Sequence, residues 1–199
     1  MTKLTSDTMI KLIEQLRHIS RTRNSPALTG LVETTLADEK FIEWPASIDK
    51  HHSYQHGLLK HTIEVMSLCI ANWNVSDTRR FNDGKTPINL ETVLISALLH
   101  DYGKVYTYNS VHHDKNTNMS RWGKTPEYTK SLHIYKSIDK AHECLDGVLD
   151  EVQLQDVIHC IGAHHGRIDY GSLWEPKTPE AWVLHLADMA SVFCIANKK

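Results

Sequence analysis

The chain has 199 residues, of which 41% are apolar and 23% charged, and its formal net charge is −2. That length suffices for one domain with a sizeable core. The near-neutral charge argues against a strongly basic protein that holds nucleic acid by bulk electrostatics, and it leaves room for a small basic groove. No apolar run reaches the roughly 20 residues of a membrane-spanning helix, so no membrane contact is expected. The amphipathic start lacks the apolar segment of a signal peptide, and the four cysteines form no C-x-x-C pair. Both features predict a cytoplasmic protein with free thiols.

The hydrophobic periodicity is helical along nearly the whole chain. Ser6 or Asp7 precedes the first helical pattern, and a second begins at Ser25-Pro26 and must end by Pro45. Further helices are predicted over residues 57–73, from Asn89 to the His100-Asp101 pair, over 131–149, over 153–165, and from Thr178 to about Ala196.

These elements predict an all-α fold, a bundle of about seven helices. Only the segment KVYTY, residues 104–108, is a fair strand candidate, as half of one small hairpin. Two long polar segments, 74–88 and 107–130, are predicted to connect helices. The second follows His100-Asp101 closely, so it could be a lid, a substrate-binding loop or a disordered segment.

Histidines and acids fall on the apolar stripes of several predicted helices. A single inward histidine is more often a satisfied core residue than a metal ligand. Several of them together would leave desolvated polar groups in the core, unless a divalent cation with its usual imidazole and carboxylate ligands compensates them. The inward residues are His61, His100, Asp101, His164, His165 and Asp188, and His133 opens the helix predicted over 131–149. The pattern therefore predicts a metal site where these helices meet.

The order His61, His100-Asp101 and Asp188 resembles the signature of the HD-domain metal-dependent phosphohydrolase superfamily. Five ordered blocks are similar to the HD domain of bacterial 3′–5′ exoribonucleases of the YhaM type: HHSYQHGLLKHT (51–62), ALLHDYGK (97–104), LHIYKSI (132–138), AHHGRIDYGS (163–172) and TPEAWVLHLADMAS (178–191). This resemblance implies a single HD domain over residues 1–199, with an N-terminal helical extension (1–40) and an HD core (41–195).

The resemblance also implies a binuclear site. Its first ion would be held by His61, His100, Asp101 and Asp188, and its second would share Asp101 and take His133 and His164. His165 would be a further ligand or a phosphate contact, and Lys104 would steady the phosphate. One or two divalent ions are expected, and Mn, Fe, Mg, Zn, Ni and Co all fit such nitrogen and oxygen ligands.

The chemistry implied is hydrolysis of a P–O bond. Two divalent cations can bind phosphoryl oxygens and make hydroxide available near neutral pH. Lys104 and a histidine of the His164-His165 pair would stabilise the charge that develops on those oxygens, and the predicted catalytic residues are Asp101, Lys104 and His165.

A substrate pocket is predicted near these residues. Tyr170 and Trp174 would equally fit simple packing of the loop before the last helix, and His51-His52 could instead cap a helix. The predicted substrate-binding residues are His51, His52, Tyr54, Tyr170, Ser172 and Trp174.

Two activities fit this site. The first is hydrolysis of a nucleotide or short single-stranded nucleic acid, as in the 3′–5′ exoribonucleases. The second is a (deoxy)nucleotide phosphohydrolase acting on mononucleotides or nucleoside triphosphates. Oligonucleotide binding should be salt-sensitive, whereas a mononucleotide pocket should not be. A regulatory module with a vestigial site is disfavoured because every expected ligand position is occupied. Assembly into a homo-oligomer stays open.

Overall fold

The computed structural model describes residues 6–114 and 119–195, and the expected all-α fold is confirmed. The helices are α1 (Ser6–Arg21), α2 (Pro26–Leu36), α3 (Glu39–Glu43), α4 (Gly57–Asn82), α5 (Leu90–Leu99), α6 (Lys104–Thr107), α7 (Leu132–Leu145), α8 (Glu151–Ala163) and α9 (Pro179–Ala190). A 3₁₀ turn, η1 (Ile168–Tyr170), follows α8, and a π-helical segment, η2 (Ser191–Ile195), continues α9. In the described part of the chain, the sheet is one antiparallel pair, β1 (Tyr108–Asp114) and β2 (Met119–Lys124).

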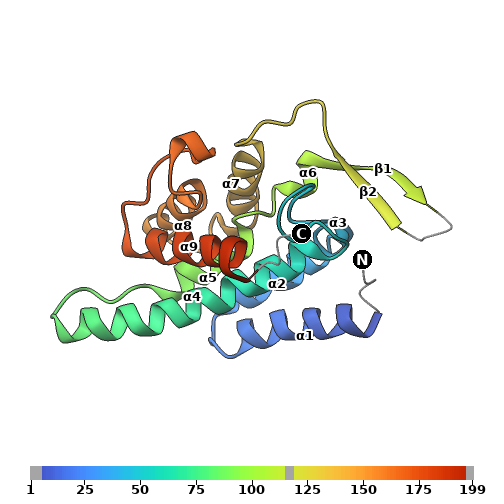
Figure 1. Ribbon diagram of the computed structural model, residues 1–199. Coiled ribbons are helices and arrows are strands. Elements are labelled where there is room, and N and C mark those ends of the chain that lie inside the picture. Colours follow the sequence, from blue (N-terminus) through green and yellow to red (C-terminus); the bar gives the residue numbers. More distant parts are fainter. Residues whose placement is uncertain (1–5, 115–118, 196–199) are drawn as a thin grey trace.

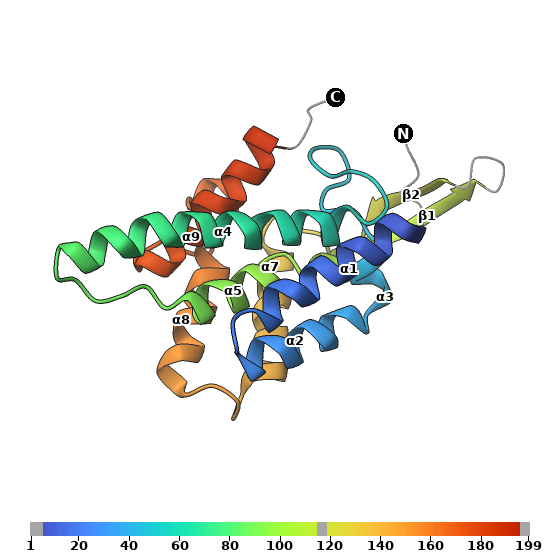
Figure 2. The ribbon, with the colours of Figure 1, turned by 90° about the horizontal axis from the view of Figure 1, so that it is seen from below.

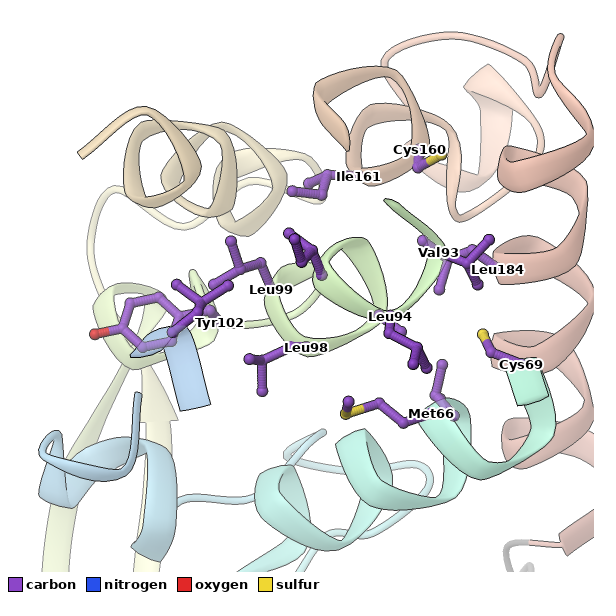
Figure 3. Packing of buried hydrophobic residues seen from close by; sticks show 14 of the residues in the cluster. Met66, Cys69, Val93, Leu94, Leu98, Leu99, Tyr102, Cys160, Ile161 and Leu184 are labelled. Carbon is purple, nitrogen blue, oxygen red and sulfur yellow. The ribbon is translucent and has the colours of Figure 1, made fainter. Parts of the chain in front are cut away.

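Helix α5 lies at the centre of the bundle and packs against α4, α8 and α9. Figure 3 shows Met66 of α4 and Ile161 of α8 on opposite sides of it. Every α5 residue from Thr92 to Leu99 is buried, which explains why its sequence is apolar all round rather than on one stripe. Each fully buried leucine there contributes about 1.5–3 kcal/mol to folding. The residues that follow Leu99 are therefore placed deep inside the molecule.

Local sequence signals set where the helices begin. The side chains of four N-cap residues each accept a hydrogen bond from a backbone N–H in the first turn, which satisfies an otherwise unpaired donor. The caps are Ser25, Asn89, Asp150 and Thr178, and the donors are Leu28, Thr92, Gln153 and Ala181 respectively. Prolines occupy the first position of α2 and α9, as the sequence predicts.

Two predicted helix boundaries differ most from the structure. The helix predicted over residues 57–73 continues to Asn82, because the returning chain is tied to its last turns: Asp77 accepts from the Ile88 N–H (2.7 Å) and Arg80 donates to the Thr86 carbonyl (2.8 Å). The helical stretch predicted from Pro26 to Pro45 is divided into α2 and α3, because the Asp38 side chain caps α3. In both cases polar contacts, rather than an apolar stripe, determine where the helix begins or ends.

The strand predicted over residues 104–108 is also wrong for most of its length. Residues Lys104–Thr107 form the short helix α6, and the hairpin lies farther along, within the segment predicted as a polar connection. Its register shifts by one residue between Ser110 and His112. The hairpin extends away from the helical body in both views (Figures 1 and 2).

The N-terminal helices pack on the bundle rather than standing apart from it: α1 contacts α4, and α2 contacts α5. Figure 2 shows α1 and α2 side by side. The division of the domain into residues 1–40 and 41–195 stays a prediction. Within the described residues, no helix combines the length and the apolar character needed to cross a membrane.

The loop before α4 approaches that helix so closely that only glycine fits at its first position. A Cβ added at Gly57 would lie 2.0 Å from the backbone oxygen of His52. We therefore expect Gly57→Ala to lower the free energy of unfolding by about 1–3 kcal/mol, as overpacking does. Denaturant unfolding measures this loss. The matched control is Gly30→Ala in α2, where nothing lies within 4 Å of the added Cβ. That control should be neutral or stabilising, since alanine favours helix. Equal stability of the two variants would contradict the tight packing at Gly57.

Candidate metal centre

The residues predicted to bind metal come together from five helices. Asp101 lies between them, and its two carboxylate oxygens face different partners. Oδ1 lies 3.4 Å from Nε2 of His133 and 3.8 Å from Nε2 of His164. Oδ2 lies 3.4 Å from Nε2 of His61 and 3.5 Å from Nε2 of His100. One carboxylate therefore stands between two groups of ring nitrogens.

Each group has a further member. Asp188, from α9, joins the Oδ2 side, with its Oδ1 3.2 Å from Nε2 of His61 and 3.9 Å from Nε2 of His100. His165 joins the Oδ1 side, where Asp101, His133, His164 and His165 each offer a ligand atom within 4.8 Å of the others. This grouping is compatible with the two ions sharing Asp101 that the family resemblance implies, and the assignment of ligands to ions stays a prediction.

Hydrogen bonds fix which ring nitrogen of His100 and of His164 faces the centre. Nδ1 of His100 lies 2.8 Å from the Ala97 carbonyl, and Nδ1 of His164 lies 2.7 Å from the Ile161 carbonyl. Because a carbonyl oxygen can only accept, both Nδ1 atoms carry the hydrogen, and both neutral rings leave an Nε2 lone pair toward Asp101. Metal-ligating histidines are commonly held in this way.

Several polar atoms at the centre are buried without a hydrogen-bond partner: Oδ1 of Asp101, Nε2 of His133, Nε2 of His164 and Nδ1 of His165. Such atoms cost free energy unless something binds them. Moreover, Nε2 of His100 and Nε2 of His61 lie 3.2 Å apart, and two lone pairs at that distance repel unless a proton or a cation lies between them. Imidazole and carboxylate are ligands of divalent cations, so the donor set fits one or two such ions.

The charges at the centre also favour a cation. Burial opposes ionisation of Asp101, but the ammonium group of Lys104, which contacts it directly, holds the pKa of that carboxyl well below its usual range. The pKa of Asp188 is likewise lowered despite burial, by its hydrogen bond from His61. Two buried carboxylates therefore lie at the centre, and Lys104 contacts Asp101.

Most of the imidazoles around these carboxylates are in the neutral form that binds a metal ion. Burial lowers the pKa of His164 to about 4 and that of His165 to about 3, and it lowers the pKa values of His100 and His133. These rings are thus neutral near pH 7, the form that binds a metal. At His61 burial opposes protonation, but its hydrogen bonds with Asp101 and Asp188 prevail and raise its pKa. A proton there occupies the place that a cation would take.

The predicted substrate-binding residues before α4 lie beside this centre. The ring centroid of His51 is 4.9 Å from that of His61, and both ring nitrogens of His51 are buried without a partner. Burial lowers its pKa to about 2, so the ring is neutral. His52 is buried against Glu64, and its ring lies 5.9 Å from that of Tyr54. The alternative that His51-His52 caps a helix is wrong, because the N-cap position of α4 is His56.

The predicted residues after α8 are placed differently. Tyr170 is exposed, with its ring 5.4 Å from the guanidinium carbon of Arg167. Ser172 donates a hydrogen bond to the Gly162 carbonyl, and Trp174 donates one to the His159 carbonyl. The structure therefore ties Ser172 and Trp174 to α8. For Trp174 this favours the packing alternative. The substrate role of all three stays a prediction.

Two residues near the centre were missed by the sequence reasoning. Glu64 accepts hydrogen bonds from His52 and from Ser191, and Ser191 also contacts His61. Burial opposes ionisation of Glu64, but its contacts with His52 and Lys60 lower its pKa to about 2. Their spacing carried a signal, because Glu64 follows His61 by three residues and Ser191 follows Asp188 by three, so each shares a helix face with a predicted ligand.

Comparison with known proteins identifies the class. Residues 58–191 match the HD domain family, so the chain belongs to this family, and the expected class, an HD-domain phosphohydrolase, is confirmed.

Curated relatives include a dihydroneopterin 2′,3′-cyclic phosphate phosphodiesterase of Methanocaldococcus jannaschii, 29% identical over 194 residues, which cover 92% of this chain and 67% of that protein. The 3′–5′ exoribonuclease YhaM of Geobacillus sp. is 26% identical over 151 residues, covering 76% of this chain and 42% of that protein. The YhaM of Oceanobacillus iheyensis is 23% identical over 186 residues, covering 90% and 52%. The chain thus spans about half the length of the exoribonucleases it matches. No solved structure matches it significantly.

Proposed function

We propose that the chain hydrolyses phosphodiester bonds, with one or two divalent metal ions held around Asp101. The observation that carries this proposal is the position of Asp101, whose two oxygens face separate groups of neutral, inward-pointing imidazoles. The names of the relatives support it, because a cyclic phosphate phosphodiesterase and an exoribonuclease both cleave phosphodiester bonds.

In this proposal one ion is bound by His61, His100, Asp101 and Asp188, and the other by Asp101, His133 and His164. Bound divalent cations supply Lewis acidity, which polarises phosphoryl oxygens and makes hydroxide available near neutral pH. Lys104 balances the charge of Asp101 and donates toward the phosphate. His165, neutral and without a partner at Nδ1, donates toward the phosphoryl oxygens, where negative charge increases during hydrolysis. No serine or cysteine nucleophile is needed.

The proposed substrate is a nucleotide phosphodiester, either cyclic or at the end of a short single strand. His51 would contact its phosphate, because both its ring nitrogens are buried, unpartnered and next to the ligand His61. A small substrate is favoured by the net charge of −2, since long nucleic acids are held by many basic side chains. The second candidate is a mononucleotide or nucleoside triphosphate, which the same near-neutral charge also allows.

The test is a product assay with Mn²⁺-loaded protein. A 2′,3′-cyclic nucleotide, a 5′-labelled oligonucleotide and a nucleoside triphosphate are offered separately, and the products are identified by mass. Opening of the cyclic ester, or stepwise shortening of the oligonucleotide, is the expected result. Phosphate release from the triphosphate alone would replace the proposal with the second candidate. No product from any of the three would contradict both.

The two groups of ligands predict separable ions. His133 lies only on the Oδ1 side of Asp101, so His133→Ala should remove one ion and leave the other. Elemental analysis should show one Mn²⁺ per chain instead of two. The control is His142→Ala, because His142 is exposed and pairs with Asp146 instead. An unchanged Mn²⁺ content in the His133 variant would show that this side holds no ion.

A further inference from the structure

A largely buried carboxylate lies next to the ligand His61 and is bonded to residues other than the metal ligands. Glu64 lies on α4 beside His61, and its side chain is 12% exposed. Its Oε2 lies 3.0 Å from Nε2 of His52 and 3.1 Å from Oγ of Ser191. Its Oε1 lies 3.2 Å from the ammonium group of Lys60. Both oxygens are therefore engaged, and none of these three contacts is made by a proposed metal ligand.

The carboxylate of Glu64 sets the direction of the two hydrogen bonds that join it, through Ser191, to His61. Ionised Glu64 can only accept, so the single hydroxyl hydrogen of Ser191 is donated to it. The oxygen of Ser191 must then accept from Nδ1 of His61, which lies 3.0 Å away. With a hydrogen fixed on Nδ1, His61 can present the Nε2 lone pair to a cation between Asp101 and Asp188. A chain of two hydrogen bonds thus links Glu64, through Ser191, to Nδ1 of His61, the ring nitrogen that faces away from the metal.

We infer that Glu64 is a positioning residue of the metal site, which acts through Ser191 to fix the tautomer and the orientation of His61. This inference rests on the proposed metal-dependent function and deepens it. In His100 and His164 a backbone carbonyl fixes the hydrogen on Nδ1. In His61 the same role falls to side chains, Ser191 directly and Glu64 through Ser191. Partners of this kind typically change metal affinity by 10–100-fold.

The same oxygen of Glu64 also connects the centre to the loop before α4. His52, which it binds, has a left-handed backbone conformation with φ of 47°, and its carbonyl accepts from the Ala46 N–H (3.2 Å). His51, the neighbour of His52, lies against His61. Glu64 therefore holds both a ligand and the segment that carries the proposed phosphate contact. Ser191 bonds Glu64 and the ligand His61, whereas the bond to His52 is made by Glu64, so the two residues can be separated experimentally.

The experiment titrates Mn²⁺ into the metal-free, full-length protein and measures binding by calorimetry. Ser191→Ala should raise the Kd of the tightest Mn²⁺ about tenfold or more, with an unchanged number of ions at saturation. The matched control is Ser20→Ala, since Ser20 is equally buried but bonds a carbonyl within α1. It should bind Mn²⁺ like the wild type. Wild-type affinity in the Ser191 variant would overturn the inference.

Glu64→Gln provides a second route if the Ser191 variant does not fold. The amide keeps the shape of the side chain but removes the charge that makes it an obligatory acceptor, so Mn²⁺ binding should weaken in the same direction. Wild-type affinity here would likewise overturn the inference. In the Zn²⁺-loaded wild type, ¹⁵N spectra of the His61 ring should show the hydrogen on Nδ1. A ring coordinated through Nδ1 instead would overturn it.

These measurements separate the inference from the proposed function. Weakened Mn²⁺ binding in the variants, with no hydrolysis by the wild type, would support the role of Glu64 and contradict the activity. Hydrolysis by the wild type with unchanged Mn²⁺ binding in the variants would support the activity and contradict the role of Glu64. A wild type that binds no Mn²⁺ would contradict both.

Discussion

Replacing Asp101 with asparagine should lower the rate of phosphodiester hydrolysis by roughly three orders of magnitude or more. The change keeps the size of the side chain but removes the charge that faces four ring nitrogens at 3.4–3.8 Å. It should also reduce the Mn²⁺ content, because both proposed ions share this residue. Steady-state kinetics and elemental analysis of the same preparation measure the two effects together.

The control for this variant is Asp139→Asn. Asp139 is an exposed acid whose ion pair with Lys136 lies on the surface of α7, where such pairs contribute little. It should retain wild-type activity. Circular dichroism should show that the Asp101 variant keeps its helices, so that lost activity is not lost folding. Full activity in a folded Asp101 variant would contradict the shared-ligand arrangement.

Adding Mn²⁺ to the metal-free protein should raise its melting temperature markedly. An ion that binds only the folded chain stabilises it by about 4.1 kcal/mol at a concentration 1,000-fold above Kd. For a chain of this length, that corresponds to roughly 8–16 °C. The physical reason is the set of buried, unpartnered atoms at the centre, which the ion would bind. Scanning calorimetry with and without a chelator measures the shift.

The Asp101→Asn variant serves as the matched control for this stabilisation. Since Asp101 is the ligand proposed for both ions, most of the Mn²⁺-dependent shift should disappear in that variant. If wild type and variant showed the same shift, the ion would be binding elsewhere. If the wild type melted at the same temperature with Mn²⁺ and with chelator, the centre would not hold the metal.

The convergence of the metal centre could be predicted from helical periodicity. Ligands such as His61 and Asp188 occupy the apolar stripes of their helices, and a stripe must face the core. His100 and Asp101 follow a helix that is buried on every side, so they had to be buried too. The assignment of each ligand to a particular ion came from the resemblance to a family, and it stays a proposal.

The surroundings of the centre could not be predicted in the same way. Glu64 and Ser191 are 127 residues apart in the chain, and no local pattern pairs two side chains at that separation. The hairpin was predicted too early in the chain, at residues 104–108, because its strands lie in a polar segment without clear alternation. The last turns of α4 are held by Asp77 and Arg80, whose bonds to the returning chain depend on the tertiary fold.

The most direct test of the account is a titration of Mn²⁺ into the metal-free protein while phosphodiester hydrolysis is followed. The account predicts no product before metal is added, and a rate that rises and saturates over the Mn²⁺ range in which calorimetry detects binding. It also predicts that Asp101→Asn stays inactive throughout the titration. Undiminished hydrolysis in the presence of a chelator, or no hydrolysis at saturating Mn²⁺, would contradict it.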